Sequence, residues 1–181
     1  MPASLLLLEL ETLGMPPQGD CIIPGFENHI VLNSIRWNIA PSTAAEAADK
    51  NQQRTLKAGN VTVSKIFDRS STALCNLMKQ QRTKDRPYHF KTATLRFVDP
   101  NTGARAGSGD KFDSVMEMKL VNGWIEKVTV NVADGSKSVA VRETIELSFE
   151  GSISISYSAY NPNKRFRESA KFFRYEPPAK K

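Results

Sequence analysis

Residues 141–160, VRETIELSFEGSISISYSAY, alternate between apolar and polar side chains. The apolar side chains occupy odd positions, namely Val141, Ile145, Leu147, Phe149, Ile153, Ile155, Tyr157 and Ala159. The polar ones occupy even positions, namely Arg142, Thr144, Glu146, Ser148, Glu150, Ser152, Ser154, Ser156 and Ser158. Successive side chains of a strand point to opposite faces, so the pattern predicts β structure with one face in a core and one face of small hydroxyls. Such a polar face suits water or a wide wet cavity more than a catalytic pocket.

This stretch is longer than one ordinary strand, so the chain must bend or turn back within it. Gly151 is its one permissive joint. A two-residue hairpin loop at Glu150 and Gly151 would pair Phe149 with Ser152 and place apolar side chains against hydroxyls. A three-residue loop that pairs Phe149 with Ile153 keeps the register, and so does a single strand that bends at Gly151. Both alternatives remain open from the sequence.

The same two-residue period predicts further strands over 4–13, 29–39, 60–67, 89–98, 114–121 and 124–132. Turns are indicated by DPNTG at 99–103, by NG at 122–123 and by DG at 134–135. The last two are hairpin signals, because glycine tolerates positive φ. The spacing predicts a mainly β fold, a compact antiparallel β-barrel of two packed sheets.

One segment departs from this period and predicts a short helix beside the barrel. In DRSSTALCNLMKQQR, residues 68–82, Asp68, Ser70 or Ser71 can cap the helix. Leu74, Leu77 and Met78 form an apolar stripe at helical spacing. The barrel is therefore expected to carry one flanking helix.

Length and charge bound the class of protein. The chain has 181 residues, enough for one core, and we expect a single domain over 1–175 with a disordered tail over 176–181. It carries 25 Lys and Arg against 19 Asp and Glu, a net charge of +6, which permits an acidic partner without requiring one. Its two cysteines, Cys21 and Cys75, belong to no metal-binding motif, so we expect free structural thiols.

The amino-terminal run SLLLLELETL, residues 4–13, has no basic residue before its leucines and two glutamates among and after them. We therefore expect a strand there rather than a signal peptide. No segment approaches the length of apolar residues that a membrane span needs, so we expect no membrane partner.

Catalytic signatures are missing, and we expect no enzyme, no cofactor and no metal. His29 and His89 are isolated in strand-like segments, where a hydrogen-bonded structural role is the commoner one. No serine lies in a GxSxG elbow, which argues against a hydrolase. GARAGSGD at 103–110 lacks a phosphate-binding motif and reads as a hairpin loop.

Two segments have little core-forming character. Residues 41–57 contain almost no large apolar side chain, which predicts a loop or else a weak helix. KRFRESAKFFRY, residues 164–175, interleaves basic and aromatic side chains as a single-strand nucleic-acid platform does. An edge strand that packs its aromatics is the favoured interpretation, so we do not expect nucleic acid as a partner.

Four segments carry a resemblance to a known family, namely SIRWNI at 34–39, VSKIFDRSSTAL at 63–74, KTATLRF at 91–97 and RETIELSF at 142–149. In this order they resemble the corresponding segments of the hemolysin-coregulated protein (Hcp) family of bacterial type VI secretion. The resemblance extends from about residue 4 to residue 162. It implies a compact β-barrel with a flanking helix that assembles as hexameric rings, which stack into the inner tube of a contractile injection machine.

The resemblance also implies roles for individual residues. Ser34, Arg36 and Asn38 are expected to face the lumen of the ring. Residues of the 41–57 segment are expected to reach the adjacent ring, with Pro41, Glu46, Asp49, Lys50 and Lys57 as candidates. The implied partners are further copies of the chain, effectors in the lumen, and sheath, baseplate and spike proteins. The implied location is the bacterial cytoplasm, followed by export through the machine without a signal peptide.

Two other functions are weighed against this one. A tail-tube protein of a phage-like contractile particle is physically the same kind of object. A monomeric β-barrel that binds single-stranded nucleic acid rests on the basic aromatic segment 164–175 alone.

Overall fold

A computed structural model describes residues 4–41, 56–99, 114–135, 138–157, 160–161, 166–167 and 171–177. It contains one helix and thirteen strands in the described ranges, and all of the strand pairs are antiparallel. The elements are β1 (Leu5–Glu11), β2 (Ile30–Leu32), β3 (Ser34–Arg36), β4 (Ile39–Pro41), β5 (Leu56–Ala58), β6 (Val61–Ile66), α1 (Arg69–Lys79), β7 (Phe90–Val98), β8 (Ser114–Gly135), β9 (Ser138–Phe149), β10 (Ile153–Tyr157), β11 (Tyr160–Asn161), β12 (Phe166–Arg167) and β13 (Lys171–Tyr175). The mainly β prediction with one short helix is confirmed.

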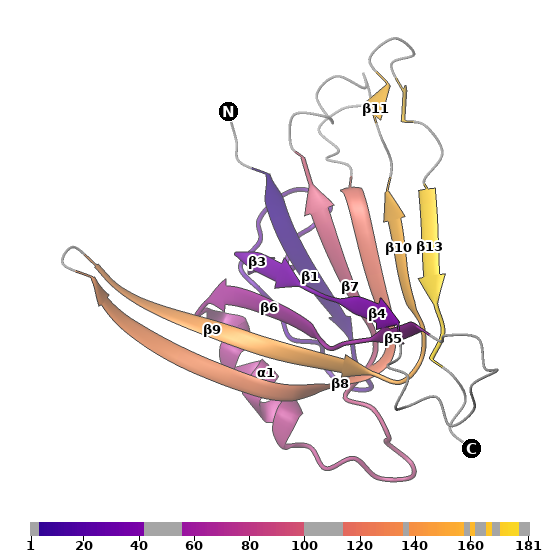
Figure 1. Cartoon of the computed structure of the whole chain (residues 1–181). Coiled ribbons are helices and arrows are strands. Elements are labelled where there is room, and N and C mark those ends of the chain that lie inside the picture. The colour runs from indigo at the N-terminus through magenta and orange to yellow at the C-terminus, as the bar shows by residue number, and fades with distance from the viewer. Residues whose placement is uncertain are drawn as a thin grey trace.

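The first and last strands of the main sheet are neighbours in the chain. Its strand order is β2-β1-β7-β8-β9-β6-β3, with β10 and β13 added beside β8. Since only Asn33 separates β2 from β3, the first and last strands of this order are halves of one extended segment. The ladder therefore wraps around the core, and Figure 1 shows the long β8–β9 pair crossing in front of β1 and β7.

The core lies inside this wrapped sheet and is built from the apolar positions of the alternating strands. The seventeen buried members of the main cluster are Leu8, Leu10, Ile30, Leu32, Val61, Val63, Leu74, Leu77, Phe90, Ala93, Leu95, Met118, Leu120, Ile125, Ile145, Leu147 and Ile153. A smaller cluster consists of Leu7, Cys21, Phe26 and Val98. The odd positions of the 141–160 stretch thus face the core where they are described, apart from Tyr157, which is exposed.

The predicted hairpin at Asn122 and Gly123 is wrong, because β8 runs through both residues as one strand of 22 residues. Asn122 has a φ of 55°, so the local signal for a left-handed residue is real, but it produces a bend rather than a reversal. A side chain at Gly123 would lie 2.3 Å from the ring of Phe90 and 2.4 Å from the carbonyl of Ser148. The glycine is therefore needed for close packing, and long-range pairing overrides the turn.

The bend at Gly151 answers the question that the sequence left open. Both β9 and β10 pair with β8, so the chain continues in one direction and does not form a hairpin there. Gly151 N donates to the carbonyl of Val121 at 3.0 Å, and Glu150 N donates to the carbonyl of Asn122 at 2.9 Å. A side chain on Gly151 would lie 2.6 Å from Val121 O. The two bends, at 122–123 and 150–152, thus face each other across the ladder.

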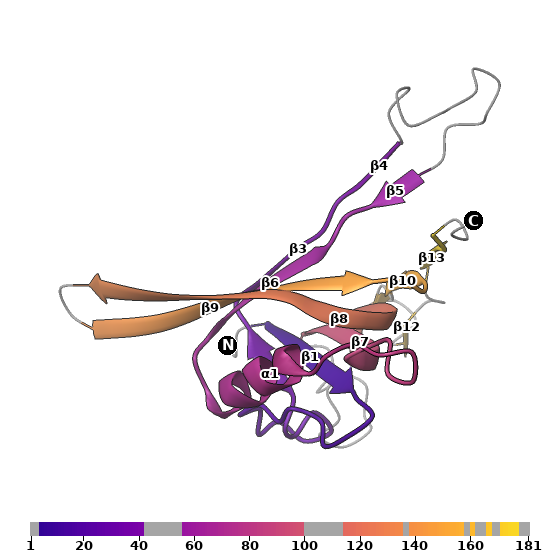
Figure 2. The ribbon, with the colours of Figure 1, turned by 90° about the horizontal axis from the view of Figure 1, so that it is seen from below.

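A hairpin is present near Asp134 and Gly135, as expected, but the turn does not lie on these two residues. Both belong to β8, where Asp134 pairs with Val139 and Gly135 with Ser138 of β9. The connection itself, residues 136–137, lies outside the described part. The ladder of β8 and β9 extends beyond the end of β6, whose last pair with β9 is Ile66 and Arg142. The hairpin therefore projects from the body of the protein at one end, as Figures 1 and 2 show.

Two expectations about segment boundaries are corrected. The strand expected over 29–39 is divided into β2, β3 and the start of β4, with breaks at Asn33 and at Trp37 and Asn38. The ends of the expected 41–57 loop are strands, because β4 pairs with β5 from Ile39 and Ala58 to Pro41 and Leu56. These two strands lead away from the sheet as a narrow arm (Figure 2). The strand at 4–13 and the helix within 68–82 are confirmed.

The carboxy-terminal aromatics form an edge strand, as the favoured interpretation of 164–175 expected. β13 pairs with β10 in register from Ile153 and Tyr175 to Tyr157 and Lys171. The ring of Phe173 lies 6.2 Å from that of Trp37, measured between centroids. Residues 100–113 lie outside the described part, and so does the expected loop at 103–110; of the expected tail, the structure describes residues 176 and 177.

Candidate functional site

The candidate site is the polar side of the sheet formed by β3, β6, β9 and the distal half of β8. Its central row consists of four hydroxyl side chains at matching positions on neighbouring strands, namely Ser34, Ser64, Thr144 and Thr129. All four are partly exposed, and the Oγ atoms of Ser34 and Ser64 are 2.7 Å apart. We call the side of the sheet that carries this row the hydroxyl face.

The next row on the hydroxyl face is charged. It consists of Arg36, Thr62, Glu146 and Lys127, again at matching positions on the four strands. Arg36 and Lys127 are exposed at its two ends, and Arg142 is exposed one row beyond the hydroxyls. These three cations make no ion pair within the part of the chain that the structure describes. Against the carboxylates of Glu146 in this row and of Glu126 at the end of the face, the three cations give the face a positive balance.

One end of the hydroxyl face is closed by a polar cluster around Glu126. The Oε2 atom of Glu126 accepts hydrogen bonds from Trp124 Nε1 at 2.5 Å and from Ser148 Oγ at 3.2 Å. The guanidinium carbon of Arg82 lies 4.1 Å from the centre of the Trp124 ring, a cation–π contact. The loop after α1 is thereby attached to β8.

The structure places the three lumen candidates together at one edge of this face. Ser34 and Arg36 lie on β3, where Ser34 belongs to the hydroxyl row and Arg36 to the charged row. Asn38 is exposed just beyond β3, and its carbonyl accepts a hydrogen bond from Gly59 N at 3.0 Å. Asn38 therefore connects the hydroxyl face to the start of the arm.

The inter-ring candidates fall on the arm and beyond it. Pro41 is exposed on β4, and Lys57 is exposed on β5 opposite Ala40. Glu46, Asp49 and Lys50 lie outside the described residues. The arm therefore brings both ends of the candidate segment to one place, away from the core.

The helix candidates fall at the cap and the buried stripe of α1. Asp68 is the N-cap, and its Oδ1 atom accepts a hydrogen bond from Ser70 N at 2.8 Å. Ser71 Oγ accepts one from Asp68 N at 2.9 Å, which completes a capping box. Leu74 and Leu77 are buried, while Met78 packs against the core from a partly buried position.

Sequence reasoning missed a buried charged cluster beneath this cap. Lys65 Nζ lies 2.9 Å from Glu143 Oε2 and 2.8 Å from Asp68 Oδ1, and it donates to Ser71 Oγ at 2.9 Å. Lys65 has no exposed surface and Glu143 has 1%. Both occupy core-facing positions in their alternating strands. Lys65 lies two residues after the buried Val63, and Glu143 lies two residues before the buried Ile145. A charged residue of each sign at apolar positions of two strands was the available signal.

The same cluster shifts the acidity of the cap. Burial raises the pKa of Asp68, but hydrogen bonds from Lys65 and Ser70 outweigh it, so that pKa lies below its ordinary value. The oxygen Oε1 of Glu143 has no hydrogen-bond partner among the described residues. The Lys65 ammonium has its donors occupied, with Ile66 O at 2.8 Å as a further acceptor, so the cluster is a structural clamp rather than a reactive group.

A second charged cluster lies on another part of the main sheet, around Arg96 of β7. Its Nη1 atom is 2.7 Å from Glu9 Oε2, and its Nε atom is 3.1 Å from Glu117 Oε2. The hydrogen bond from Arg96 lowers the pKa of Glu9 against the opposing effect of burial. His29 Nε2 lies 3.0 Å from Arg96 Nη1. His29 therefore belongs to a network of polar contacts with Arg96 and Glu9 at the surface.

His89 has the structural role that was expected of it. Its Nε2 atom lies 2.9 Å from the carbonyl of Gln80, and its Nδ1 atom accepts a hydrogen bond from Ile125 N at 3.2 Å. It joins the end of α1 to β8. The expected free thiols are confirmed for Cys21 and Cys75.

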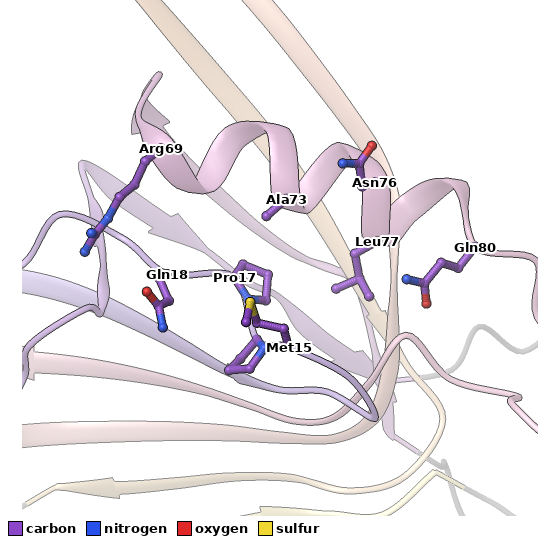
Figure 3. Close-up of a pocket in the computed structure, with 9 residues that line it drawn as sticks. Met15, Pro17, Gln18, Arg69, Ala73, Asn76, Leu77 and Gln80 are labelled. Carbon is purple, nitrogen blue, oxygen red and sulfur yellow. The ribbon is translucent and has the colours of Figure 1, made fainter.

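Within the described ranges, no group of three or more His, Cys, Asp or Glu side chains is placed to hold a metal ion. None of the described helices has the length and apolar character to cross a membrane. A hollow of about 490 Å³ lies between α1 and the segment before β2. Figure 3 shows Met15 and Pro17 on one side of it and Arg69, Ala73 and Leu77 of the helix on the other.

Comparison with known proteins gives a matching family model and solved structures of similar fold. Residues 8–157 match the model of a family described as type VI secretion system effector, Hcp. The structure is similar to that of a type six secretion system protein, with a TM-score of 0.71 at 16% identity over 97% of this chain and 96% of the other. It is also similar to a variant of Hcp1 from E. coli EAEC 042 pathovar, with a TM-score of 0.67 at 16% identity over 96% of this chain and 99% of that one.

Hcp1 from Salmonella typhimurium gives a TM-score of 0.66 at 18% identity over 95% of each chain. At these identities the structural likeness concerns the fold. No curated protein sequence gives a significant match.

Proposed function

The chain belongs to the Hcp family of type VI secretion, and from this membership we propose that it is a structural subunit of the inner tube of the secretion machine. In this proposal six copies close a ring, rings stack into a tube, and effectors travel in the lumen. Contraction of the sheath exports the tube from the bacterial cytoplasm. The subunit acts through its shape and surface rather than through catalysis, and its partners are further copies, effectors, and sheath, baseplate and spike proteins.

The observation that carries the proposal is the hydroxyl face. A sheet that buries one side and lines the other with matching rows of hydroxyl and charged side chains is suited to a hydrated wall. Ser34, Arg36 and Asn38 lie at one edge of this wall and would face the lumen. Short hydroxyls and exposed cations give weak polar contacts, which allow a cargo to be held and released.

The arm supports a role between rings. β4 and β5 carry Pro41 and Lys57 away from the barrel as a pair of strands (Figure 2). A projecting segment can contact an adjacent ring without disturbing the contacts within its own ring. We assign the arm and the residues that it connects, 42–55, to stacking.

Native mass spectrometry and negative-stain electron microscopy of the purified chain test the proposal together. We expect a species of six times the subunit mass and hollow rings in the images. A protein that stays monomeric at high concentration, with no ring in any image, would contradict it.

A further inference from the structure

The helix side of the protein carries a groove that the proposed tube function does not use. Its larger part is the hollow of about 490 Å³ between α1 and residues 15–18. A second hollow, of about 80 Å³, adjoins it and shares Leu77 and Gln80 with it. Ser71 of α1 bonds the core-facing Lys65, so both hollows lie on the opposite side of the sheet from the hydroxyl face (Figure 2). We call the two hollows together the helix groove.

The walls of the helix groove are held in place by the fold. Pro17 is buried in the loop wall, and Gly19 N next to it donates to the carbonyl of Asn28 at 2.7 Å. Arg69 joins this loop to the helix wall, because its Nε atom lies 2.9 Å from Asp20 Oδ1 and donates to the carbonyl of Gly19 at 2.7 Å. The groove is therefore formed before a ligand binds.

The groove also offers polar groups that the protein itself leaves unused. The side-chain amides of Gln18, Asn76 and Gln80 line it, and none of the three makes a hydrogen bond within the described ranges. Figure 3 shows the Gln80 amide directed toward the hollow. A primary amide both donates and accepts, so it can bond the N–H and C=O groups of a chain that lies beside it. From Arg69 to Gln80 the helix rises about 16 Å, the length of about five residues of an extended chain.

Apolar side chains form the rest of the groove. Ala73 and Leu77 of α1 face Pro17 across the larger hollow. At the rim, Met15 is 90% exposed and Leu13 is 53% exposed. Apolar side chains left exposed beside a hollow mark a binding surface. The flexible methionine can adapt to a side chain that enters.

The end of the groove at the last turn of α1 is basic. Residues 79–86 carry Lys79, Arg82, Lys84 and Arg86 against Asp85, and all five are exposed. Arg86 lines the smaller hollow and makes no ion pair in the part of the chain that the structure describes. This hollow can hold a carboxylate in place of two waters of about 30 Å³ each. A guanidinium binds a carboxylate through two parallel hydrogen bonds.

We propose that the helix groove binds an extended acidic peptide segment of a partner protein. An apolar side chain of the segment lies over Ala73 and Leu77 under Met15, its backbone bonds the unused amides, and a carboxylate reaches Arg86. The net charge of +6 on this chain favours an acidic partner over a second copy at this basic end. The binding is a property of one subunit and does not rest on the tube function.

Two synthetic peptides test the inference by fluorescence anisotropy with the purified full chain. The labelled probe Asp-Asp-Ser-Leu-Ser-Asp-Asp has carboxylates on both sides of its leucine, so it can enter the groove in either direction. The reference peptide has serine in place of the leucine. We expect the leucine probe to bind about tenfold more tightly than the reference, because one leucine side chain is buried. Equal binding of the two peptides would overturn the inference.

Arg86→Glu should weaken the binding of both peptides by roughly tenfold, because it replaces the cation that meets their carboxylates. Arg174→Glu is the matched control. Arg174 is exposed on β13, outside the groove, so this variant has the same net charge and should bind the peptides as the wild type does. Equal binding by the two variants would contradict the role of Arg86.

Ala73→Arg places a long side chain in the hollow and adds a cation. It should abolish the preference for leucine although the protein becomes more basic. Met15→Ser changes an exposed position that the core does not need, and it should reduce the same preference several-fold. A preference that survives in both variants would overturn the inference.

Native mass spectrometry of Arg86→Glu and Ala73→Arg identifies the other possible occupant. Both variants should give the assembly of the wild type. A smaller assembly in either one would assign the groove to a contact between copies and overturn the proposal. The peptide measurements apply to a monomer and to a ring alike, so a wild type without rings would refute the tube function and leave this inference standing.

Discussion

Lys65 and Glu143 form an ion pair of 2.9 Å between two side chains that are inaccessible to water. They are directly opposite each other in the β6–β9 ladder. Ser71 Oγ donates to the same carboxylate oxygen at 2.8 Å, so the pair also holds the first turn of α1 against the sheet. A buried pair of this kind is weak evidence of net stability, yet breaking it leaves one charge uncompensated.

Lys65→Met is therefore expected to lower the free energy of unfolding by about 3–5 kcal/mol, because Glu143 remains buried without its partner. The double variant Lys65→Met with Glu143→Leu should regain part of this loss, since the buried charge of Glu143 is gone while Asp68, 14% exposed, still lacks its cation. Urea unfolding of the wild type and of the variants measures both effects. A double variant as unstable as Lys65→Met would show that the clamp contributes net stability through its hydrogen bonds.

Asp68 gives the fold a dependence on pH. Burial raises the pKa of Asp68, but hydrogen bonds from Lys65 and Ser70 lower it by more than burial raises it. The pKa of Asp68 in the folded protein therefore lies below its pKa in the unfolded chain. A group of this kind contributes stability that is complete above its unfolded pKa, about 4, and is lost as pH falls through the folded pKa. We expect the free energy of unfolding to decline below about pH 4.

Asp68→Asn separates the charge from the cap, because asparagine caps a helix about as well as aspartate does. Urea unfolding between neutral and acidic pH should show a weaker decline in this variant than in the wild type. Glu9, whose pKa Arg96 lowers, contributes the same sign of dependence and remains in both proteins. An unchanged decline in Asp68→Asn would assign the effect to other carboxylates.

Gly151→Ala tests the bend between β9 and β10. The added Cβ would lie 2.6 Å from the carbonyl oxygen of Val121, a backbone atom held in the ladder. We expect a loss of about 1–3 kcal/mol in the free energy of unfolding, the cost of overpacking. Gly14→Ala is the control, because no atom lies within 4 Å of its Cβ position. Equal stabilities of the two variants in urea would contradict the close approach.

The period of the strands and the helical spacing of Leu74 and Leu77 were enough to predict the elements and the polar side of the sheet. Both are local patterns, which one sequence displays in full. Whether Asn122 and Gly123 form a hairpin turn or a bend within one strand was not predictable from the same patterns. The dipeptide favours positive φ in a turn and in a bend alike, and the choice depends on pairing with β9 and β10, residues distant in the chain.

The clamp escaped prediction for a related reason. Lys65 and Glu143 each break an apolar series by a single residue, and each alone indicates an exposed position. Only the β6–β9 register brings the two together and compensates both charges.

Replacing residues 42–55 by a short glycine–serine linker tests the role of the arm. The strands that flank this segment, β4 and β5, are kept, so their pairing and the rest of the fold are unchanged. We expect the ring mass in native mass spectrometry to be that of the wild type, while stacks of rings in negative-stain images become shorter or disappear. Tubes of unchanged length would refute the stacking role.

Arg36→Glu tests the hydroxyl face as the lumen wall. Arg36 is exposed and makes no ion pair within the described ranges, so the substitution should leave the fold and the rings intact. It reverses one of the three exposed cations of a face whose carboxylates are Glu146 and Glu126, and it does so in every subunit. A dye-labelled oligoglutamate peptide should be retained less well by the assembled variant, by up to roughly fivefold for each contact of about 1 kcal/mol. Fluorescence anisotropy measures this retention, with an oligolysine peptide of equal length as the opposite probe.

Lys91→Glu is the matched control, because Lys91 is exposed on β7, outside the strands of the hydroxyl face. Loss of rings in Arg36→Glu would place this side chain in a subunit contact instead, and equal retention by the two variants would remove Arg36 from the lumen.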